Sequence, residues 1–174
     1  PLQVHTTLCR RTLPYLPAMA ALAEELGAVV WAVFCLVPTG RAQYDDEITP
    51  REYEDTFAWL IERSRTARWD LKVTEGYHFR RVLAQRVGRP ASGLGFQSGD
   101  GIGRAPKAVN AGSGFCFISH TGDVCPSGFL PIVTGNVRET SLVELYRDHP
   151  VFRALRDPAQ LTGRCGRCRF RAIC

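Results

Sequence analysis

The sequence predicts an α/β protein in which a half built of strands and helices is followed by a cysteine-rich region. Apolar strand-like runs alternate with amphipathic helical runs over residues 1–66, and most of the cysteines lie after residue 115. Alternation of this kind favours parallel strands joined by right-handed crossovers, with the helices outside the sheet. The composition, 45% hydrophobic and 22% charged, is that of a folded soluble chain.

The first pair of elements is a short strand at residues 4–8 and a helix of about three turns. Pro17 is tolerated in the first turn of that helix, and Gly27 is placed as its C-terminal stop. The helix is indicated by apolar residues at helical spacing, which are Leu16, Met19, Ala20, Ala23 and Leu26.

The second pair begins with residues 29–37, which are almost continuously apolar and suit a strand buried on both faces. The helix that follows starts at a capping box formed by Thr49 and Glu52, with Pro50 at the first helical position. Its apolar stripe consists of Tyr53, Phe57, Leu60 and Ile61. Two strands do not make a stable sheet alone, so we expect the chain to be a piece of a longer protein with residues missing on both sides.

Residues 70–113 are expected to form an irregular connection, because glycine is concentrated there and residues 77–87 are the only amphipathic piece. Loops this long in compact proteins are usually functional or mobile. A β-hairpin follows, with a strand at residues 115–119, a turn at residues 120–123 and a second strand from Val124.

Past the hairpin, residues 135–136 mark another turn. Ser141 and Glu144 form a second capping box, which predicts a short helix that Pro150 ends.

The seven cysteines are the most informative feature of the composition. An odd number without a secretory signal argues against a disulfide scaffold. Cys165, Cys168 and Cys174 lie in one turn-rich segment, where Gly163 and Gly166 let the backbone bend around a metal. Thiolates in this density suit either zinc or an iron–sulfur cluster, and spacing alone does not separate the two. Cys9 and Cys35 have no partner spacing and are expected to be core or surface thiols.

The hairpin supplies two candidates for a fourth ligand, Cys116 and Cys125. A two-residue turn at residues 121–122 or 122–123 places both cysteines on one face, because side chains alternate with period two. A three-residue loop reverses this relationship.

These segments together resemble the SPASM or twitch-type C-terminal region of radical SAM enzymes. The resemblance rests on residues 114–131 (GFCFISHTGDVCPSGFLP), on GNVR at 135–138, on the short SLxELY helix and on the motif Cys165-x2-Cys168-x5-Cys174. Upstream, residues 3–8, 13–27 and 31–41 resemble the fifth and sixth strand units of the radical SAM partial barrel. The segment TEGYHFRR at 74–81 and the FISHTG hairpin resemble the branch of haem-pathway decarboxylase-like proteins and their uncharacterised relatives.

The resemblance implies three parts: the last βα units of a partial (β/α) barrel at 1–69, an irregular connection at 70–113, and a SPASM-like auxiliary-cluster region at 114–174. It implies a 4Fe-4S cluster held by Cys165, Cys168 and Cys174, with Cys116 as the first choice for the fourth ligand and Cys125 as the second. The family carries a further cysteine after the last motif, and we expect this chain to be truncated before it. The number of clusters therefore stays open.

The family's N-terminal Cys-x3-Cys-x2-Cys motif, which holds the cluster that cleaves S-adenosylmethionine (SAM), has no counterpart in this chain. The resemblance therefore implies a radical SAM enzyme as the full-length parent and an inactive fragment here. It assigns no catalytic residue.

Contact with SAM is expected where the strands end, because α/β sheets bind ligands at that edge. Thr6 and Thr7 end the first strand, and Pro38, Gly40 and Arg41 follow the second. For the threonines, a hydroxyl that satisfies local backbone groups is an equal interpretation.

His78 and Arg80 are candidates for contact with an anionic substrate, such as one with propionate arms; the simpler interpretation is an exposed helix face.

The function expected from these features is SAM-dependent radical modification of a peptide, porphyrin-like or other small-molecule substrate, supported by an auxiliary cluster. The alternative is a zinc-stapled binding module without catalysis; a cluster-carrying electron-transfer protein would leave the strand–helix half without a purpose. The expected partners are the substrate and an electron donor such as a ferredoxin or flavodoxin. The arginines are scattered among acidic residues, which argues against nucleic acid. No apolar run reaches membrane-spanning length, so a cytoplasmic protein is expected.

Overall fold

The computed structural model describes residues 1–87 and 110–173, and the chain divides into two compact units. Residues 1–87 belong to unit 1, and residues 110–172 belong to unit 2. None of the helices in the described ranges is long and apolar enough to cross a membrane.

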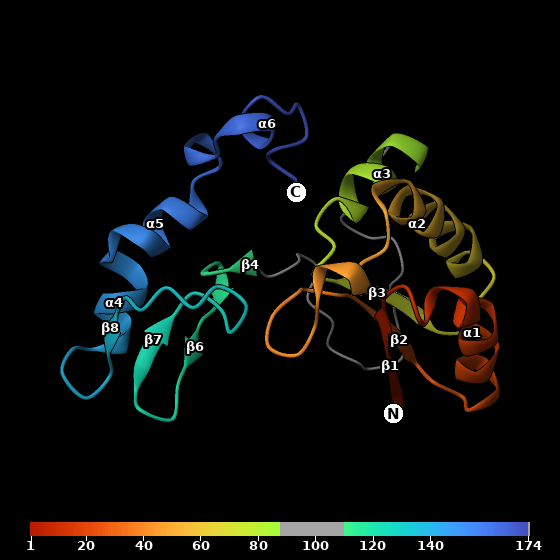
Figure 1. Ribbon diagram of the computed structural model, residues 1–174, viewed down its shortest axis with the longest axis horizontal. Coiled ribbons are helices and arrows are strands. Elements are labelled where there is room, and N and C mark those ends of the chain that lie inside the picture. Colours follow the sequence, from red (N-terminus) through yellow and green to blue (C-terminus); the bar gives the residue numbers. More distant parts are fainter. Residues whose placement is uncertain (88–109, 174) are drawn as a thin grey trace. The chain divides into compact units, whose positions relative to one another are not determined.

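Unit 1 is built on a three-stranded parallel sheet in the order β1-β2-β3 (Figure 1). The strands are β1 (Gln3–Leu8), β2 (Val30–Cys35) and β3 (Asp70–Thr74). Leu8 pairs with Cys35 and Phe34 pairs with Thr74, so the carboxyl ends of all three strands meet at one edge. The predicted parallel pairing of the first two strands is confirmed.

The third strand corrects the expected irregular connection at its start. Residues 70–74 continue the sheet, and α3 (Phe79–Val87) follows them within the predicted amphipathic piece. Residues 88–109, which make up the rest of that connection before β4, lie outside the described residues.

Three helices connect and follow these strands: α1 (Leu16–Glu25), α2 (Pro50–Ser64) and α3. The capping box of α2 is confirmed, since the Thr49 hydroxyl accepts the Glu52 N–H at 3.3 Å and the Glu52 carboxylate accepts the Thr49 N–H at 2.7 Å. The predicted stop of α1 is also confirmed, because the helix ends at Glu25 and Gly27 takes a φ of +66°. Short 3₁₀ helices at Leu13–Tyr15 (η1) and Tyr44–Asp46 (η2) complete the connections.

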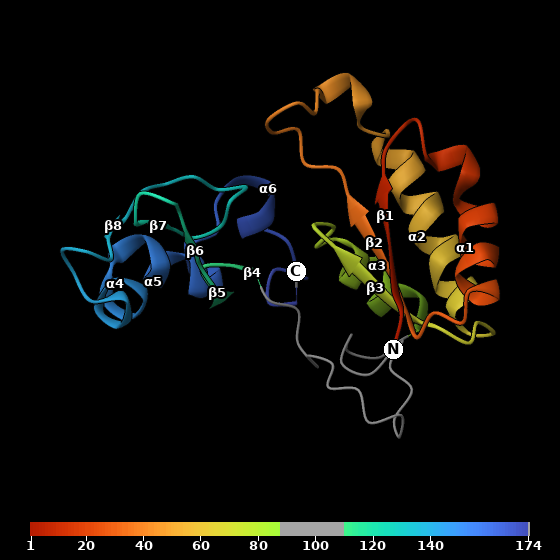
Figure 2. The same cartoon turned by 90° about the horizontal axis from the view of Figure 1, so that it is seen from below.

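The helices cover one face of the sheet (Figure 2). Alternate strand residues, including Trp31 and Val33, pack there with Phe57 of α2 and Val82 of α3 in one buried cluster. The opposite face carries Val30, Ala32 and Phe34 of β2, flanked by polar side chains of the two outer strands. Its members include the exposed Gln3, His5 and Thr7 of β1 and the exposed Lys72 of β3.

Unit 2 consists of short strands and short helices around a small core. The strands are β4 (Asn110–Ala111), β5 (Gly114–Phe115), β6 (Phe117–Ile118), β7 (Asp123–Cys125) and β8 (Gly135–Asn136); the helices are α4 (Leu142–Asp148), α5 (Pro150–Arg156), η3 (Pro158–Gln160) and α6 (Gly163–Gly166). Val124, Leu145 and Phe152 form the core, and Cys116 and Tyr146 pack against it.

The short helix of unit 2 begins after Ser141 as predicted, but the Ser141 side chain makes no capping hydrogen bond. Pro150 lies just past the end of α4 and starts α5, where its fixed φ suits a first helical position.

Arg156 joins the two helices. Its guanidinium donates to the backbone oxygens of Tyr146 at 2.6 Å and Arg147 at 2.8 Å, and it lies 5.0 Å from the centre of the Tyr146 ring.

Candidate functional site

The turn that carries Cys165 and Cys168 is tight. The Cys168 N–H donates to the Cys165 carbonyl at 3.1 Å, and the Phe170 N–H donates to the Cys168 sulfur at 3.4 Å. Gly166 lies between the cysteines, where a Cβ atom would come within 2.2 Å of the Leu161 carbonyl oxygen. Glycine is therefore required at this position if the Leu161 backbone is to approach the turn this closely.

The two thiols of this turn fit a soft metal or cluster. Both are free of disulfides; Cys165 is exposed and Cys168 is half-buried, so both sulfurs are accessible to an incoming ligand. A backbone N–H directed at sulfur stabilises thiolate charge, as charge-assisted hydrogen bonds do. Thiolates are the ligands that zinc and iron–sulfur clusters select.

A complete ligand set is not assembled by the described residues. Among residues 1–87 and 110–173, no three or more His, Cys, Asp and Glu side chains form a group that could hold a metal ion. Cys174, the third predicted ligand, lies outside the described residues. The turn therefore offers two ligands, and the others stay predictions.

The hairpin that carries Cys116 and Cys125 has a three-residue loop. Phe117 pairs with Cys125 and Ile118 pairs with Val124, while the Ser119 N–H donates to the Asp123 carbonyl at 2.9 Å. The loop is possible because Gly122 takes a φ of +94°, a left-handed conformation that glycine adopts without strain.

This register corrects the expectation that both hairpin cysteines share one face. Cys125 lies opposite Phe117, so Cys116 lies on the other face, which is the face that contacts the small core. Cys116 is half-buried, whereas Cys125 is only 5% exposed. Burial raises the pKa of both thiols, and at Cys125 the Asp123 charge raises it further. Either thiol must therefore lose a proton to bind a metal.

The carboxyl edge of the unit 1 sheet holds the residues expected to contact SAM. Thr6 is buried on the helix-covered face, where its hydroxyl accepts the Trp31 indole N–H at 2.9 Å. Thr7 is exposed on the opposite face, and its carbonyl accepts the Thr12 hydroxyl at 2.5 Å. The Thr6 hydroxyl thus makes a hydrogen bond within the core, while the Thr7 side chain is exposed.

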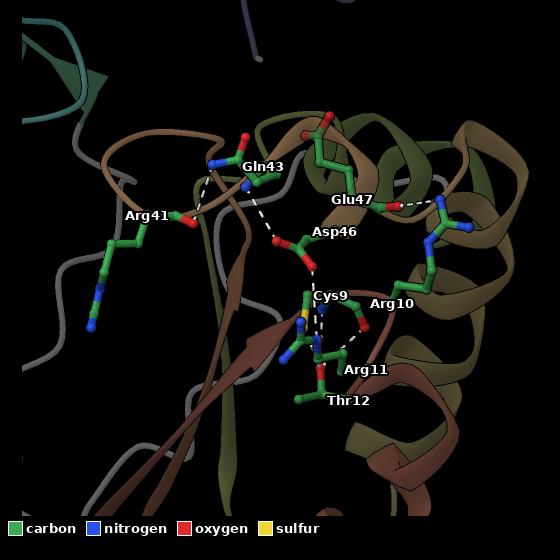
Figure 3. Close-up of polar contacts among 8 residues, drawn as sticks. All are labelled: Cys9, Arg10, Arg11, Thr12, Arg41, Gln43, Asp46 and Glu47. Atoms are coloured by element: carbon green, nitrogen blue, oxygen red, sulfur yellow. Dashed lines mark hydrogen bonds and ion pairs between the residues drawn. The ribbon is translucent and has the colours of Figure 1, made fainter.

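The segment after β2 contains the other SAM candidates. Gly40 takes a φ of +63° and turns the chain, and Pro38 precedes it as a half-buried residue. The Arg41 carbonyl accepts a hydrogen bond from the Gln43 carboxamide at 3.5 Å (Figure 3). The Arg41 side chain is exposed and points away from the other labelled residues.

His78 and Arg80, the candidates for substrate contact, lie at the start of α3. His78 is half-buried between two rings of α2, with centroid distances of 5.2 Å to Tyr53 and 4.8 Å to Phe57. This burial, together with the positive charge of Arg81, lowers the pKa of His78. Arg80 is partly exposed. His78 therefore packs against α2. It does not lie on an exposed helix face, which was the simpler interpretation of the sequence.

The two cysteines outside the cluster region differ in environment. Cys35 is buried, so of the two environments that the sequence left open it has the core one; burial and the nearby Glu75 raise its pKa to about 12. Cys9 is partly exposed; burial opposes its ionisation, but hydrogen bonds from Thr12 and Arg11 outweigh that effect and lower its pKa.

Three features at the sheet were not found by reading the sequence. His5 stacks on Phe34 with a centroid distance of 5.1 Å on the open face, a position that the period-two alternation of residues 3–8 marks. Glu75 takes a left-handed φ of +59°, for which the sequence gives no signal. Asp46 caps η2 together with Gln43, and their spacing of three residues was the available signal.

Comparison with known proteins bears on the cysteine-rich region first. Residues 110–169 match the SPASM family, described as an iron-sulfur cluster-binding domain. The chain therefore contains a SPASM domain. Its range takes in β4 and ends just after Cys168, so four of the five predicted ligands fall inside the SPASM domain.

The similarity extends beyond the SPASM domain to the whole chain. An AdoMet-dependent heme synthase of Methanosarcina barkeri is 38% identical over 174 residues, which is 100% of this chain and 50% of the relative. The protein of the same name from Oleidesulfovibrio alaskensis is 39% identical, covering 99% of this chain and 45% of the relative. The protein of the same name from Nitratidesulfovibrio vulgaris is 37% identical, and the match covers 99% of this chain and 47% of the relative. The chain spans about half the length of these curated relatives.

Proposed function

We propose that this chain supplies the later strands of a partial barrel and an auxiliary-cluster domain to a radical SAM enzyme of haem synthesis. The observation that carries the proposal is similarity at 37–39% identity across at least 99% of the chain to three AdoMet-dependent heme synthases. The similarity covers both halves, so unit 1 and the SPASM domain are proposed to act within one enzyme.

The arrangement of unit 1 supports the partial barrel. Strands in the sequential order β1-β2-β3, with helices on one face, are wound in a single direction. A doubly wound sheet reverses direction and covers both of its faces with helices. Barrels instead keep their helices outside and turn the other face inward. The open face of the sheet, where the exposed Thr7, His5 and Lys72 flank apolar side chains of β2, is then proposed to be a wall of the reaction cavity.

The SPASM domain is proposed to hold a 4Fe-4S cluster through Cys165, Cys168 and Cys174. When bound, such a cluster supplies electron acceptance or a substrate contact. The chain's own contribution is the turn closed by the hydrogen bond from the Cys168 N–H to the Cys165 carbonyl, and the Phe170 N–H directed at one sulfur. Cys116 is the proposed fourth ligand, because its half-buried thiol is more accessible than that of Cys125.

The residues at the sheet edge are proposed to bind and orient SAM. Thr7 offers an exposed hydroxyl, and Gly40 allows close approach to the backbone of the segment that ends at Arg41. Thr6 is proposed to act indirectly. Its hydroxyl accepts a hydrogen bond from the Trp31 indole, which holds the end of β1 in place.

The proposed substrate is a tetrapyrrole with carboxylate arms. The names of the three relatives favour a haem precursor over a peptide. Arg80 is the proposed contact for a carboxylate, and His78 is proposed to position α3 rather than to meet the substrate directly. A ferredoxin or flavodoxin is proposed as the electron donor.

The proposal is tested with the full-length protein purified without oxygen. We expect it to cleave SAM to 5′-deoxyadenosine under reducing conditions and to release carbon dioxide from a propionate-bearing iron porphyrin. Cleavage of SAM without turnover of any tetrapyrrole contradicts the substrate class alone. Absence of SAM cleavage, with iron and sulfide present, contradicts the proposed enzyme.

A further inference from the structure

Two chain segments emerge side by side from the carboxyl edge of the unit 1 sheet. Residues 9–12 follow β1, and residues 36–47 follow β2. The second segment contains the proposed SAM contacts Gly40 and Arg41, and its only regular structure is η2 (Tyr44–Asp46). The backbone hydrogen bonds within this segment each span only two or three residues, so contacts with the neighbouring segment add to its order.

Asp46 ties the second segment to the first. Its carbonyl accepts the Arg10 N–H at 2.8 Å, and its carboxylate lies 3.8 Å from the Arg11 guanidinium (Figure 3). Next to it, the Glu47 carbonyl accepts the Arg10 guanidinium at 3.2 Å. Both main-chain and side-chain contacts of the first segment thus converge on residues 46–47.

The same carboxylate reaches back toward the proposed SAM contacts. Its other oxygen accepts the Gln43 N–H at 3.2 Å, and the Gln43 carboxamide donates to the Arg41 carbonyl at 3.5 Å. A continuous series of polar contacts therefore runs from Arg11 through Asp46 and Gln43 to Arg41 (Figure 3).

These contacts contribute little to the stability of the unit as a whole. The Arg11 side chain is 86% exposed, and exposed ion pairs are weak because water screens them. None of the contacts involves the buried cluster around Trp31 and Phe57. The effect of the network is local, on the shape of residues 41–46.

We infer that Asp46 is a positioning residue for SAM, which holds residues 41–46 in the conformation that presents Gly40 and Arg41 to the ligand. This inference rests on the proposed function. Asp46 itself is proposed to touch no ligand and to act through the backbone of its own segment.

The test compares Asp46→Asn with Asp45→Asn in the full-length protein. Asp45 is the matched control, because it lies in the same 3₁₀ helix and makes no ion pair or side-chain hydrogen bond within the described part of the chain. The Asn side chain has nearly the shape of Asp but lacks the negative charge that pairs with the Arg11 guanidinium and accepts the Gln43 N–H. We expect the SAM dissociation constant to rise about tenfold for Asp46→Asn, the effect of weakening one charge-assisted hydrogen bond, and to stay unchanged for Asp45→Asn.

Amide hydrogen exchange gives a readout that does not depend on SAM. Exchange of the amides of residues 42–46 should quicken in Asp46→Asn without SAM, while exchange in β2 stays unchanged. Asp46→Glu should restore part of the affinity. Arg11→Gln removes only the exposed ion pair and should therefore weaken binding in the same direction but by less than tenfold; it serves as the second test if Asp46→Asn fails to fold.

Two results overturn the inference. One is unchanged SAM affinity in both Asp46→Asn and Arg11→Gln; the other is faster exchange with unchanged affinity. If the wild-type protein itself binds no SAM, the proposed function fails instead, and the exchange data then report only on the local structure of the segment.

Discussion

Cys125 lies opposite Phe117 across the β6–β7 hairpin, which places Cys116 on the other face of the same hairpin. A single cluster iron approached from one side therefore meets one of these cysteines and not both. Cys116 is half-buried and Cys125 is 5% exposed, so the more accessible thiol is Cys116.

The hairpin cysteines should therefore behave differently on substitution. Cys116→Ser should lower the iron and sulfide content of the anaerobically purified protein, while Cys125→Ser should leave both unchanged. The measurement is chemical iron and sulfide analysis with an absorbance spectrum. Equal losses from both variants would indicate two sites or a shared one, and loss from Cys125→Ser alone would reverse the assignment.

Gly166 should be as important for cluster incorporation as the cysteines beside it. In Gly166→Ala the new Cβ atom meets the Leu161 carbonyl oxygen at 2.2 Å, so either the Leu161 backbone or the turn that carries the two cysteines must shift. We expect a marked fall in cluster content. Arg167→Ala is the control, since Arg167 is exposed between the same cysteines; if both variants kept full iron content, the turn geometry would not matter for binding.

Arg156 should stabilise unit 2 by joining its two helices. Arg156→Ala removes donors from the Tyr146 and Arg147 carbonyls at the end of α4, where helix carbonyls lack partners. We expect a loss of about 1–3 kcal/mol in the free energy of unfolding, measured by denaturant titration. Arg153→Ala, at an exposed position on the same helix, should lose less than about 0.5 kcal/mol; an equal loss at both positions would contradict the role of Arg156.

Cys9 should react with a thiol-directed alkylating reagent well before Cys35. The thiolate is the reactive form, and its fraction at a given pH falls as the pKa rises. The Cys9 pKa is lowered, whereas burial and Glu75 raise the Cys35 pKa to about 12. Raising the pH from about 7 to 8.5 should therefore quicken labelling of Cys9 while the native Cys35 stays unlabelled. Mass spectrometry of peptides checks this, and early modification of Cys35 would contradict its burial.

Local sequence signals were sufficient for the first half of unit 1. The Thr49–Glu52 capping box and the apolar run of β2 each depend on neighbours within a few residues, and both are present. β3 could not be found in this way, because Asp70–Thr74 contains two charged residues and becomes a strand only by pairing with β2. Propensity is a weak guide where tertiary pairing decides the conformation.

In the candidate site, too, features set by neighbouring residues could be predicted, and features set by strand pairing could not. The spacing of Cys165 and Cys168 pointed to their shared turn directly. The relationship of Cys116 to Cys125 could not be predicted, because it depends on whether the hairpin loop has two residues or three. That choice follows from the φ of +94° at Gly122, and glycine permits either geometry. The contacts of Asp46 could not be predicted either, because its partners Arg10 and Arg11 follow a different strand.

Cys165 and Cys168 are proposed to hold an iron–sulfur cluster in the SPASM domain. The most direct test is the iron, sulfide and zinc content of the full-length protein, purified without oxygen, compared with that of its Cys165→Ser/Cys168→Ser double variant and of Cys9→Ser. We expect the double variant to lose about four iron and about four sulfide per chain, with a matching fall in the broad visible absorbance, and Cys9→Ser to lose none. Full iron content in the double variant, or the loss of a single zinc in place of iron and sulfide, would show that these cysteines hold no iron–sulfur cluster.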